Sequence, residues 1–213
     1  MPKVALFVGG ELDWFTTDFD YFVGVDRACL YLLEWGLPLD LAVGDFDSVS
    51  ESELDVIQST AKSCKKAPAE KDDTDTELAL KLIFQAFPGA EVTIFGAFGG
   101  RLDHMLSNVF LASDPELAPF MSRICLRDKQ NKVTYCPEGK HDIFPEPGMT
   151  YVSFLQEGTG ELTILGAKYE LTDRNYFQKK NYSSNEFLDG PIHVVVPNGY
   201  VIVIQTKIGR AHV

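Results

Sequence analysis

Residues 39–48 have the sequence LDLAVGDFDS, in which a short apolar run leads directly into two carboxylates. The run from Leu39 to Val43 predicts a buried strand. Alternate side chains of an extended chain point the same way, so we expect Asp45 and Asp47 to share one face while Phe46 points to the core. The stretch therefore predicts a hard-cation site at the carboxyl end of a strand. One helix-capping Asp beside one solvated Asp is the alternative.

Strands and helices alternate around this stretch over about the first 125 residues. Lys3 to Val8 predicts a buried strand that ends at Gly9-Gly10, with a helix after it, and Ser50 with Glu53 predicts a capping box. Further elements are expected at residues 28–35 (helix), 74–87 (helix), 92–95 (strand) and 102–111 (helix). This alternation implies right-handed crossovers and a mostly parallel sheet, with its ligand site at the carboxyl ends of the strands.

The sequence changes character after about Asp128, where short β-type runs are separated by Gly, Pro and Asn turns. The expected strands are Val133–Tyr135, Thr150–Leu155, Glu161–Leu165, Ile192–Val196 and Tyr200–Ile204. This pattern predicts a small antiparallel β-sandwich or barrel. We therefore expect an N-terminal α/β domain at residues 1–139, followed by an antiparallel β-sandwich domain at residues 140–213.

The formal net charge of −12 would repel the phosphate backbone of nucleic acid, so we expect no nucleic-acid partner. ATP can still bind where carboxylates hold a divalent cation against its phosphates. No apolar stretch reaches the roughly 20 residues that a membrane-spanning helix needs, and residues 1–10 lack the features of a signal peptide. Four scattered cysteines predict free thiols. These features together predict a cytoplasmic protein without a membrane partner.

A second acidic cluster begins the helix expected at residues 74–87. The sequence KDDTDTE, residues 71–77, places four acids within six residues from Asp72 to Glu77. The helix dipole accounts for one or two acids at this end, but four repelling carboxylates are costly unless a cation neutralises them. The cluster favours metal or phosphate chemistry. The alternative is a solvent-exposed helix N-terminus that has more capping acids than it needs.

A glycine-rich loop forms the third cluster, GAFGGRLDH at residues 96–104, between an expected strand and an expected helix. Free N–H groups at a helix N-terminus and the permanent charge of Arg101 suit phosphate oxygens. The loop matches neither the Walker A pattern nor G-x-G-x-x-G. His104 has two candidate roles, proton transfer and orientation of the loop. Its place in the first helical turn beside Asp103 favours the second role.

In this order and spacing, GDFDS, KDDTDTE and GGRLDH followed by Asn108 resemble the signatures of the thiamine pyrophosphokinase family. The combination is far more specific than any one motif. The resemblance covers nearly the whole chain, with further matches at residues 9–10, 24–27, 127–131, 166–171 and 184–186. Three positions depart from the family pattern: Ala28 in place of a common Gly, Lys71 in place of a frequent Gln, and Ala97 within the glycine-rich loop.

The resemblance implies a Mg²⁺-dependent enzyme that transfers the pyrophosphoryl group of ATP to the hydroxyl of thiamine, giving thiamine diphosphate and AMP. It implies a catalytic, ATP- and Mg²⁺-binding α/β domain and a thiamine-binding β-sandwich domain. It also implies a homodimer whose active sites lie between the catalytic domain of one subunit and the sandwich of the other.

The resemblance further assigns roles to individual residues. From the chemistry of the transfer we expect Asp47, Asp75 and Arg101 to be catalytic: Arg101 stabilises charge on the phosphates, and Asp47 or Asp75, whichever is not fully committed to metal, accepts the hydroxyl proton. The expected Mg²⁺ ligands are Asp45, Asp47, Asp72 and Asp75, and the expected thiamine-binding residues are Asp47, Ser184 and Asn185. The expected ATP-binding residues are Asp26, Arg27, Asp45, Lys71, Asp72, Thr74, Gly99, Gly100, Arg101, Asp103 and His104.

Two other functions agree with the residues themselves. Acidic metal clusters at strand ends also serve phosphatases and nucleotidyl hydrolases. The same acids could bind Mg²⁺ or nucleotide without turnover, as in a sensing module. Release of AMP that depends strictly on thiamine separates the kinase from the hydrolase, and single-turnover analysis separates an enzyme from a sensor.

Overall fold

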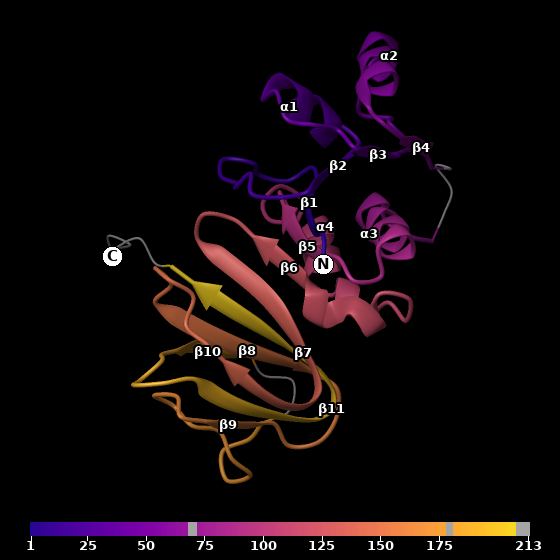
Figure 1. The fold of residues 1–213 in the computed structure, drawn as a ribbon. Helices are drawn as coiled ribbons and strands as arrows, with labels where there is room; N and C mark the ends of the chain where they lie inside the picture. The colour runs from indigo at the N-terminus through magenta and orange to yellow at the C-terminus, as the bar shows by residue number, and fades with distance from the viewer. Residues whose placement is uncertain (68–71, 178–180, 208–213) are drawn as a thin grey trace. The chain divides into compact units, whose positions relative to one another are not determined.

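The computed structural model describes residues 1–67, 72–177 and 181–207 (Figure 1). Contacts between Cα atoms divide the chain into two compact units, Met1–Asp128 and Lys129–Val213. The boundary expected at residues 139 and 140 falls within strand β7 (Asn131–Ile143). None of the helices in the described part of the chain is both long and apolar enough to cross a membrane.

The first unit is built on a parallel sheet in which the strand order is β6-β5-β1-β2-β3-β4. Each pairing between neighbours in this order is parallel. The strands are β1 (Lys3–Phe7), β2 (Tyr21–Val25), β3 (Leu41–Gly44), β4 (Cys64–Lys66), β5 (Glu91–Phe95) and β6 (Ile124–Arg127). The parallel α/β prediction is confirmed, and the carboxyl ends of β2 and β3 lie side by side.

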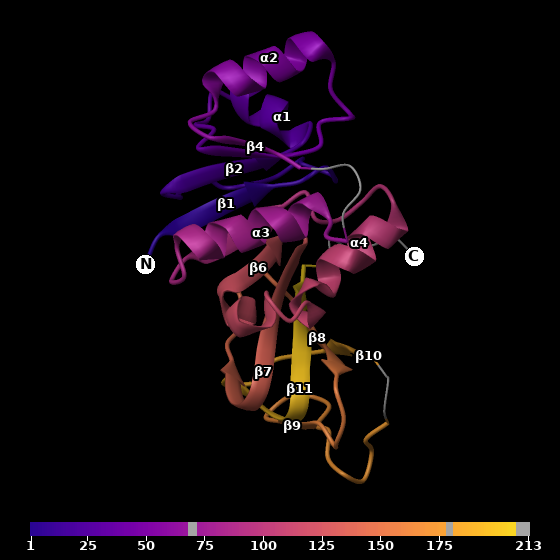
Figure 2. The same ribbon diagram turned by 90° about the vertical axis from the view of Figure 1, so that its right-hand side faces the viewer.

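Helices cover both faces of this sheet, with α1 and α2 on one side and α3 on the other (Figures 1 and 2). The helices are α1 (Ala28–Glu34), α2 (Glu51–Thr60), α3 (Asp75–Ala86) and α4 (Leu102–Val109), with short 3₁₀ turns η1 (Leu111–Ser113) and η2 (Ala118–Arg123). Capping boxes begin α2, where Ser50 pairs with Glu53 as expected, and α3, where Thr74 pairs with Glu77. These caps fix the residue at which each helix starts.

The prediction of a helix directly after Gly10 is wrong. Residues 11–20 form a loop that leads into β2, a strand that the sequence analysis missed. Aromatic side chains of this loop pack against the core on the α1 side of the sheet. For example, Phe15 stacks on Trp35 with ring centroids 4.5 Å apart. Burial of these irregularly spaced aromatics against the sheet outweighs helical propensity in a segment without a continuous apolar stripe.

The second unit consists of antiparallel strands in the order β10-β8-β11-β7, with β9 pairing β11. Its strands are β7 (Asn131–Ile143), β8 (Tyr151–Glu157), β9 (Thr163–Leu165), β10 (Asn181–Asn185) and β11 (Ile192–Thr206). The two runs expected at residues 192–196 and 200–204 are one strand. Its register shifts between Val196 and Tyr200.

This register shift lets β11 serve both layers of a β-sandwich. Residues of β11 before the shift pair with β9, and residues after it pair with β8. Side chains from both halves, including Val194 and Val203, bury into one core with Phe154 and Ile164. The predicted antiparallel β domain is therefore confirmed. Strand β10 was missed because its sequence NYSSN is polar and buries only Asn185.

Gly10 joins the loop after β1 to the loop after β5, and a side chain at this position should destabilise the first unit. A Cβ atom on Gly10 would lie 2.2 Å from the Gly96 carbonyl oxygen and 2.3 Å from that of Phe98. Because backbone atoms must move to admit it, we expect Gly10→Ala to lower the free energy of unfolding by about 2 kcal/mol or more. Gly9→Ala is the matched control, since a Cβ there meets no atom within 4 Å. Urea denaturation of both variants measures the difference, and equal stabilities would contradict the close approach.

Candidate active site

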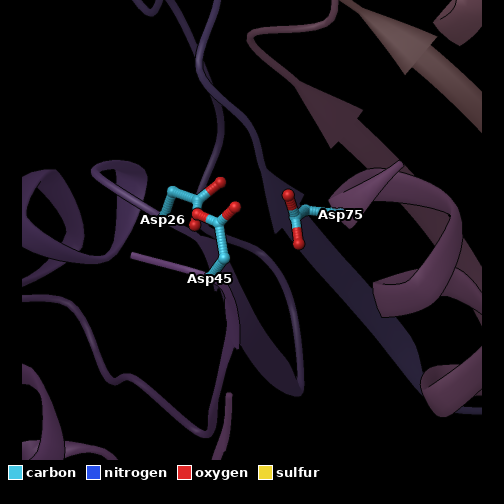
Figure 3. A group of neighbouring side chains, drawn as sticks. All are labelled: Asp26, Asp45 and Asp75. Carbon is cyan, nitrogen blue, oxygen red and sulfur yellow. The ribbon is translucent and has the colours of Figure 1, made fainter. Parts of the chain in front are cut away.

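Three carboxylates from separate segments meet at the carboxyl end of the parallel sheet (Figure 3). Asp26 follows β2, Asp45 follows β3 and Asp75 begins α3. One carboxylate oxygen from each residue lies within 4.8 Å of the others. All three side chains are partly buried. We call these residues the acidic trio. Three oxygen donors at this spacing fit a hard divalent cation such as Mg²⁺.

The backbone around β2 and β3 directs Asp26 toward the trio. Asp26 has a positive φ of 48°, and its N–H donates to the Val43 carbonyl oxygen at 2.9 Å. Its Oδ1 accepts a hydrogen bond of 3.1 Å from the Phe46 N–H. A Cβ on Gly44 would lie only 1.8 Å from that Oδ1, and Gly44 has a φ of +151°. Glycine at position 44 therefore makes room for the Asp26 carboxylate.

The side chains of Asp45 and Asp47 do not share one face of an extended chain, as the sequence suggested they would. The alternation argument requires an extended chain, but Phe46 between them has a φ of +61°. Its side chain is buried, as expected, and burial supports this uncommon conformation. The Asp47 N–H donates to Asp45 Oδ1 at 3.0 Å. Asp47 thus orients the Asp45 carboxylate through its backbone, while its own side chain is exposed and is not part of the trio.

Electrostatics at the trio raise the pKa of Asp26 to about 6. Burial is the main cause, the hydrogen bond from the Phe46 N–H opposes it, and the negative charges of Asp75, Asp45 and Asp47 raise the pKa further. Bringing like charges together in a partly buried site costs free energy, and a bound cation would relieve this cost.

The start of α3 places Asp75 in the trio. The Thr74 hydroxyl accepts from the Glu77 N–H at 3.2 Å, and the Thr74 N–H donates to Glu77 Oε2 at 2.7 Å. This capping box fixes the first helical residue, Asp75. Asp72 is exposed and outside the trio, and Lys71 lies outside the described residues.

The glycine-rich loop continues from β5 into α4. Gly99 and Gly100 have φ values of +83° and +66° in this loop. The Arg101 guanidinium donates to both oxygens of Asp103, at 3.1 Å from Nε and 2.6 Å from Nη2, and both side chains are exposed. This hydrogen bond is the main cause that lowers the pKa of Asp103 to about 2, while desolvation opposes it. Asp103 Oδ1 also accepts from the His104 N–H at 3.0 Å.

Arg27 links two segments of the same region. Its Nη1 donates to the Ser48 carbonyl oxygen at 3.3 Å, which ties the loop after β3 to the start of α1. The residue directly before it, Asp26, belongs to the trio. The Arg27 guanidinium therefore lies at the loop after β3, which carries Asp45 and Asp47, and a cationic side chain there also suits phosphate oxygens.

Ser184 and Asn185 lie on β10 of the second unit. Ser184 is exposed and has a φ of +59°. Asn185 is 3% exposed, and its Oδ1 accepts from the N–H groups of Tyr169 and Glu186 at 2.9 and 3.0 Å. Its Nδ2 donates to the Tyr169 carbonyl oxygen at 2.8 Å. The Asn185 amide thus holds the backbone at residues 169 and 186, whereas Ser184 presents its side chain to solvent.

The structure groups the predicted residues differently from the sequence analysis. It brings Asp45 and Asp75 together and adds Asp26, which the sequence analysis placed among the ATP-binding residues. Asp47 and Asp72 are near the trio in sequence but are not members of it. The missed signal for Asp26 is its position directly after the unpredicted strand β2, next to β3 in the sheet.

Two family models match the chain. The first, described as the catalytic domain of thiamin pyrophosphokinase, matches residues 13–120. The second, described as the vitamin B1 binding domain of thiamin pyrophosphokinase, matches residues 140–201. The first match includes the whole acidic trio, and the second includes Ser184 and Asn185.

Individual relatives agree with these matches. The thiamine pyrophosphokinase of Bacillus subtilis strain 168 is 36% identical over 181 residues, which cover 81% of this chain and 83% of that protein. A crystal structure of a thiamin pyrophosphokinase family protein from Enterococcus faecalis is 43% identical with a TM-score of 0.90, covering 97% of this chain and 100% of the other. A thiamin pyrophosphokinase from Geobacillus thermodenitrificans is 29% identical with a TM-score of 0.75, covering 98% and 99%.

Asp26→Asn should change how the stability of the metal-free protein depends on pH. The pKa of Asp26 is about 6 in the folded chain against an ordinary value of 3.8, so the folded chain binds more protons than the unfolded chain between these values. The stability that this group contributes is therefore complete at low pH and lost as the pH rises through about 6. We expect the Tm of the wild type in EDTA to fall relative to that of Asp26→Asn between about pH 4 and pH 7.

Thermal unfolding followed by circular dichroism measures this difference. Asp55→Asn is the control, because Asp55 is an exposed acid on α2. The control should follow the wild type at each pH, and Mg²⁺ should recover the stability that the wild type loses. Parallel pH curves for wild type and Asp26→Asn would show that Asp26 does not carry the effect.

Proposed function

Since the chain belongs to the thiamin pyrophosphokinase family, we propose that its acidic trio is the centre of pyrophosphoryl transfer. The enzyme transfers the pyrophosphoryl group of ATP to the thiamine hydroxyl, which gives thiamine diphosphate and AMP. The observation that carries the assignment of the centre is the convergence of Asp26, Asp45 and Asp75 within the match to the catalytic domain.

Asp26, Asp45 and Asp75 are the proposed ligands of Mg²⁺. When bound there, Mg²⁺ neutralises charge on the phosphate oxygens of ATP and on the oxygens that gain charge during transfer. This ligand set keeps Asp45 and Asp75 from the sequence analysis and replaces Asp47 and Asp72 by Asp26. Asp72 is exposed just before α3. We propose that it contacts ATP indirectly, through water molecules bound to the same cation.

The transfer step needs an acceptor for the thiamine proton. The hydroxyl oxygen forms a bond to the β-phosphorus, the bond from that phosphorus to the oxygen bridging the α-phosphate breaks, and AMP leaves with the bonding electrons. We assign the released proton to the carboxylate of Asp47, because Asp75 belongs to the trio whereas Asp47 is exposed outside it. Asp47 would also contact thiamine in this role.

The glycine-rich loop and its neighbours are the proposed cradle for the phosphates. Backbone N–H groups at Gly99 and Gly100 and the guanidinium of Arg101 supply donors for phosphate oxygens. Arg101 is exposed and makes two hydrogen bonds to Asp103. A phosphate that binds Arg101 would therefore replace some of these hydrogen bonds. The other proposed contacts of ATP are Asp26, Arg27, Asp45, Lys71, Thr74, Asp103 and His104.

The second unit is the proposed thiamine-binding part. The vitamin B1 binding model matches it from residue 140 to residue 201. Ser184 is exposed and available to thiamine, whereas Asn185 is engaged in three backbone hydrogen bonds and would shape the pocket by holding residues 169 and 186. We extend the proposal to a homodimer, by resemblance to the family, and to a cytoplasmic enzyme, where ATP and reduced thiols are found.

Product analysis tests this proposal against the hydrolase and the sensing module. Purified protein is incubated with ATP and Mg²⁺, with and without thiamine, and the nucleotides are separated by chromatography. We expect AMP to form one-for-one with thiamine diphosphate, and only when thiamine is present. ADP with thiamine monophosphate would mean transfer of a single phosphoryl group. AMP or ADP without thiamine would mean hydrolysis, and the absence of turnover would favour the sensing module.

Asp75→Asn and Asp47→Asn should each lower kcat by at least about a hundredfold, the scale of a lost electrostatic contact or general base. Asp75→Asn removes a charge of the trio, so it should also raise the Mg²⁺ concentration needed for half-maximal activity. Asp47→Asn leaves the trio intact and should affect mainly kcat. Steady-state kinetics at several Mg²⁺ concentrations distinguish the two. Wild-type turnover in both variants, with unchanged Mg²⁺ dependence, would make the assignment of these residues wrong.

A further inference from the structure

Helix α3, which begins with Asp75 of the acidic trio, carries a lysine that contacts three carboxylates. Lys81 Nζ lies 2.8 Å from Asp73 Oδ1, 2.8 Å from Asp114 Oδ2 and 2.7 Å from Glu116 Oε2. The lysine side chain is only 19% exposed, so its ammonium is largely shielded from water. An ion pair shielded in this way is screened less than one on the open surface.

These contacts join two segments that are separate in sequence. Asp73 directly precedes Thr74, the cap of α3, and is two residues from Asp75 of the trio. Asp114 and Glu116 lie in the turn between η1 and η2. Lys81 therefore connects the approach to α3 with a turn that follows α4.

The turn between η1 and η2 is a firm support for this contact. Asp114 Oδ1 accepts from the Glu116 N–H at 2.7 Å. The Asp114 carbonyl oxygen accepts from the N–H groups of Leu117 and Ala118 at 3.0 and 2.8 Å. Because Asp114 is fixed by its own turn, the ammonium that it binds is also fixed, and Asp73 is held by that ammonium.

The surroundings of Lys81 do not suit a phosphate ligand. Asp72 and Glu77 line the same hollow of about 560 Å³ beside the three paired carboxylates. Burial alone would lower the pKa of Lys81, but its hydrogen bonds to Asp114, Asp73 and Glu116 raise the pKa above the ordinary value, so the lysine remains charged. One positive charge faces five carboxylates in this hollow, and a phosphate would be repelled there.

We propose that Lys81 is a positioning residue, which holds Asp73 and thereby sets where Asp75 enters the acidic trio. The inference rests on the proposed function of Asp75 as a ligand of Mg²⁺. Its physical basis is that the ligands of a cation must be held to within fractions of an ångström, and that residues supporting the ligands change metal affinity when they are removed.

Lys81→Met tests the proposal, because loss of positioning and loss of charge change the affinity for Mg²⁺ in opposite directions. Loss of a positive charge from the helix that begins with Asp75 would, by electrostatics alone, strengthen the attraction of the trio for Mg²⁺. Loss of positioning weakens it. We expect the Mg²⁺ concentration for half-maximal, thiamine-dependent AMP release to rise about tenfold, and kcat at saturating Mg²⁺ to fall, while the KM for thiamine changes little. Lys81→Arg keeps the charge and the donors and should recover most of the loss.

Binding of Mn²⁺ to the enzyme without substrates, followed by electron paramagnetic resonance of the free ion, gives a readout that does not depend on turnover. The Kd for Mn²⁺ should rise in Lys81→Met in parallel with the Mg²⁺ requirement. An unchanged or lower Kd in a folded Lys81→Met variant would overturn the proposal. If the wild type itself releases no thiamine-dependent AMP, the proposed function fails instead, and the Mn²⁺ measurement still decides whether Lys81 supports the trio.

A pair of single-carboxylate variants keeps the proposal testable if Lys81→Met does not fold. Asp73→Asn removes the link to α3, whereas Glu116→Gln removes an exposed partner of the same ammonium on the other side. Each variant removes one negative charge next to Lys81. We expect only Asp73→Asn to weaken Mn²⁺ binding and to raise the Mg²⁺ requirement by about tenfold. Equal effects of the two variants, or none in either, would overturn the positioning role.

Discussion

Repulsion among Asp26, Asp45 and Asp75 is the constraint on which the catalytic half of the molecule depends. Three carboxylates do not gather in a partly buried site unless the backbone holds them there. The pKa of Asp26 is raised mainly by its burial and further by the charges of its acidic neighbours. The parallel pairing of β2 with β3 brings two of the three together, and the capping box of α3 brings the third. The fold therefore keeps a local destabilisation that a cation can relieve, as is common at functional sites.

Local interactions hold the carboxylates in place against this repulsion. Gly44 leaves the space that the Asp26 carboxylate occupies, and the Phe46 N–H binds that carboxylate. The Asp47 N–H does the same for Asp45. Beyond them, Lys81 offers a support for the approach to α3 from a turn that is distant in sequence. Each of these interactions supports one carboxylate of the trio, and Lys81 does so indirectly, through Asp73. Together they explain why three carboxylates that repel one another share one site.

Sequence reasoning predicted much of this arrangement where the signal was local. The strand before Asp45, the capped helix after Ser50 and the acidic start of α3 all follow from short patterns, and the structure contains them. The role of Asp26 was beyond such patterns, because it depends on the pairing of β2 with β3 across intervening residues. The positive φ of Phe46 likewise depends on burial by tertiary contacts, so the expectation that Asp45 and Asp47 share a face did not hold. In the second unit, polar β10 carries no apolar alternation, and its place in the sheet is set by its pairing with β8.

The most direct test of the acidic trio as the Mg²⁺ centre is anomalous diffraction from crystals of the enzyme soaked with Mn²⁺ and a non-hydrolysable ATP analogue. Mn²⁺ has the oxygen-ligand preference of Mg²⁺ and a measurable anomalous signal. We predict an anomalous peak ligated by carboxylate oxygens of Asp26, Asp45 and Asp75. A peak held by Asp47 and Asp72, with Asp26 outside its coordination shell, would contradict the account.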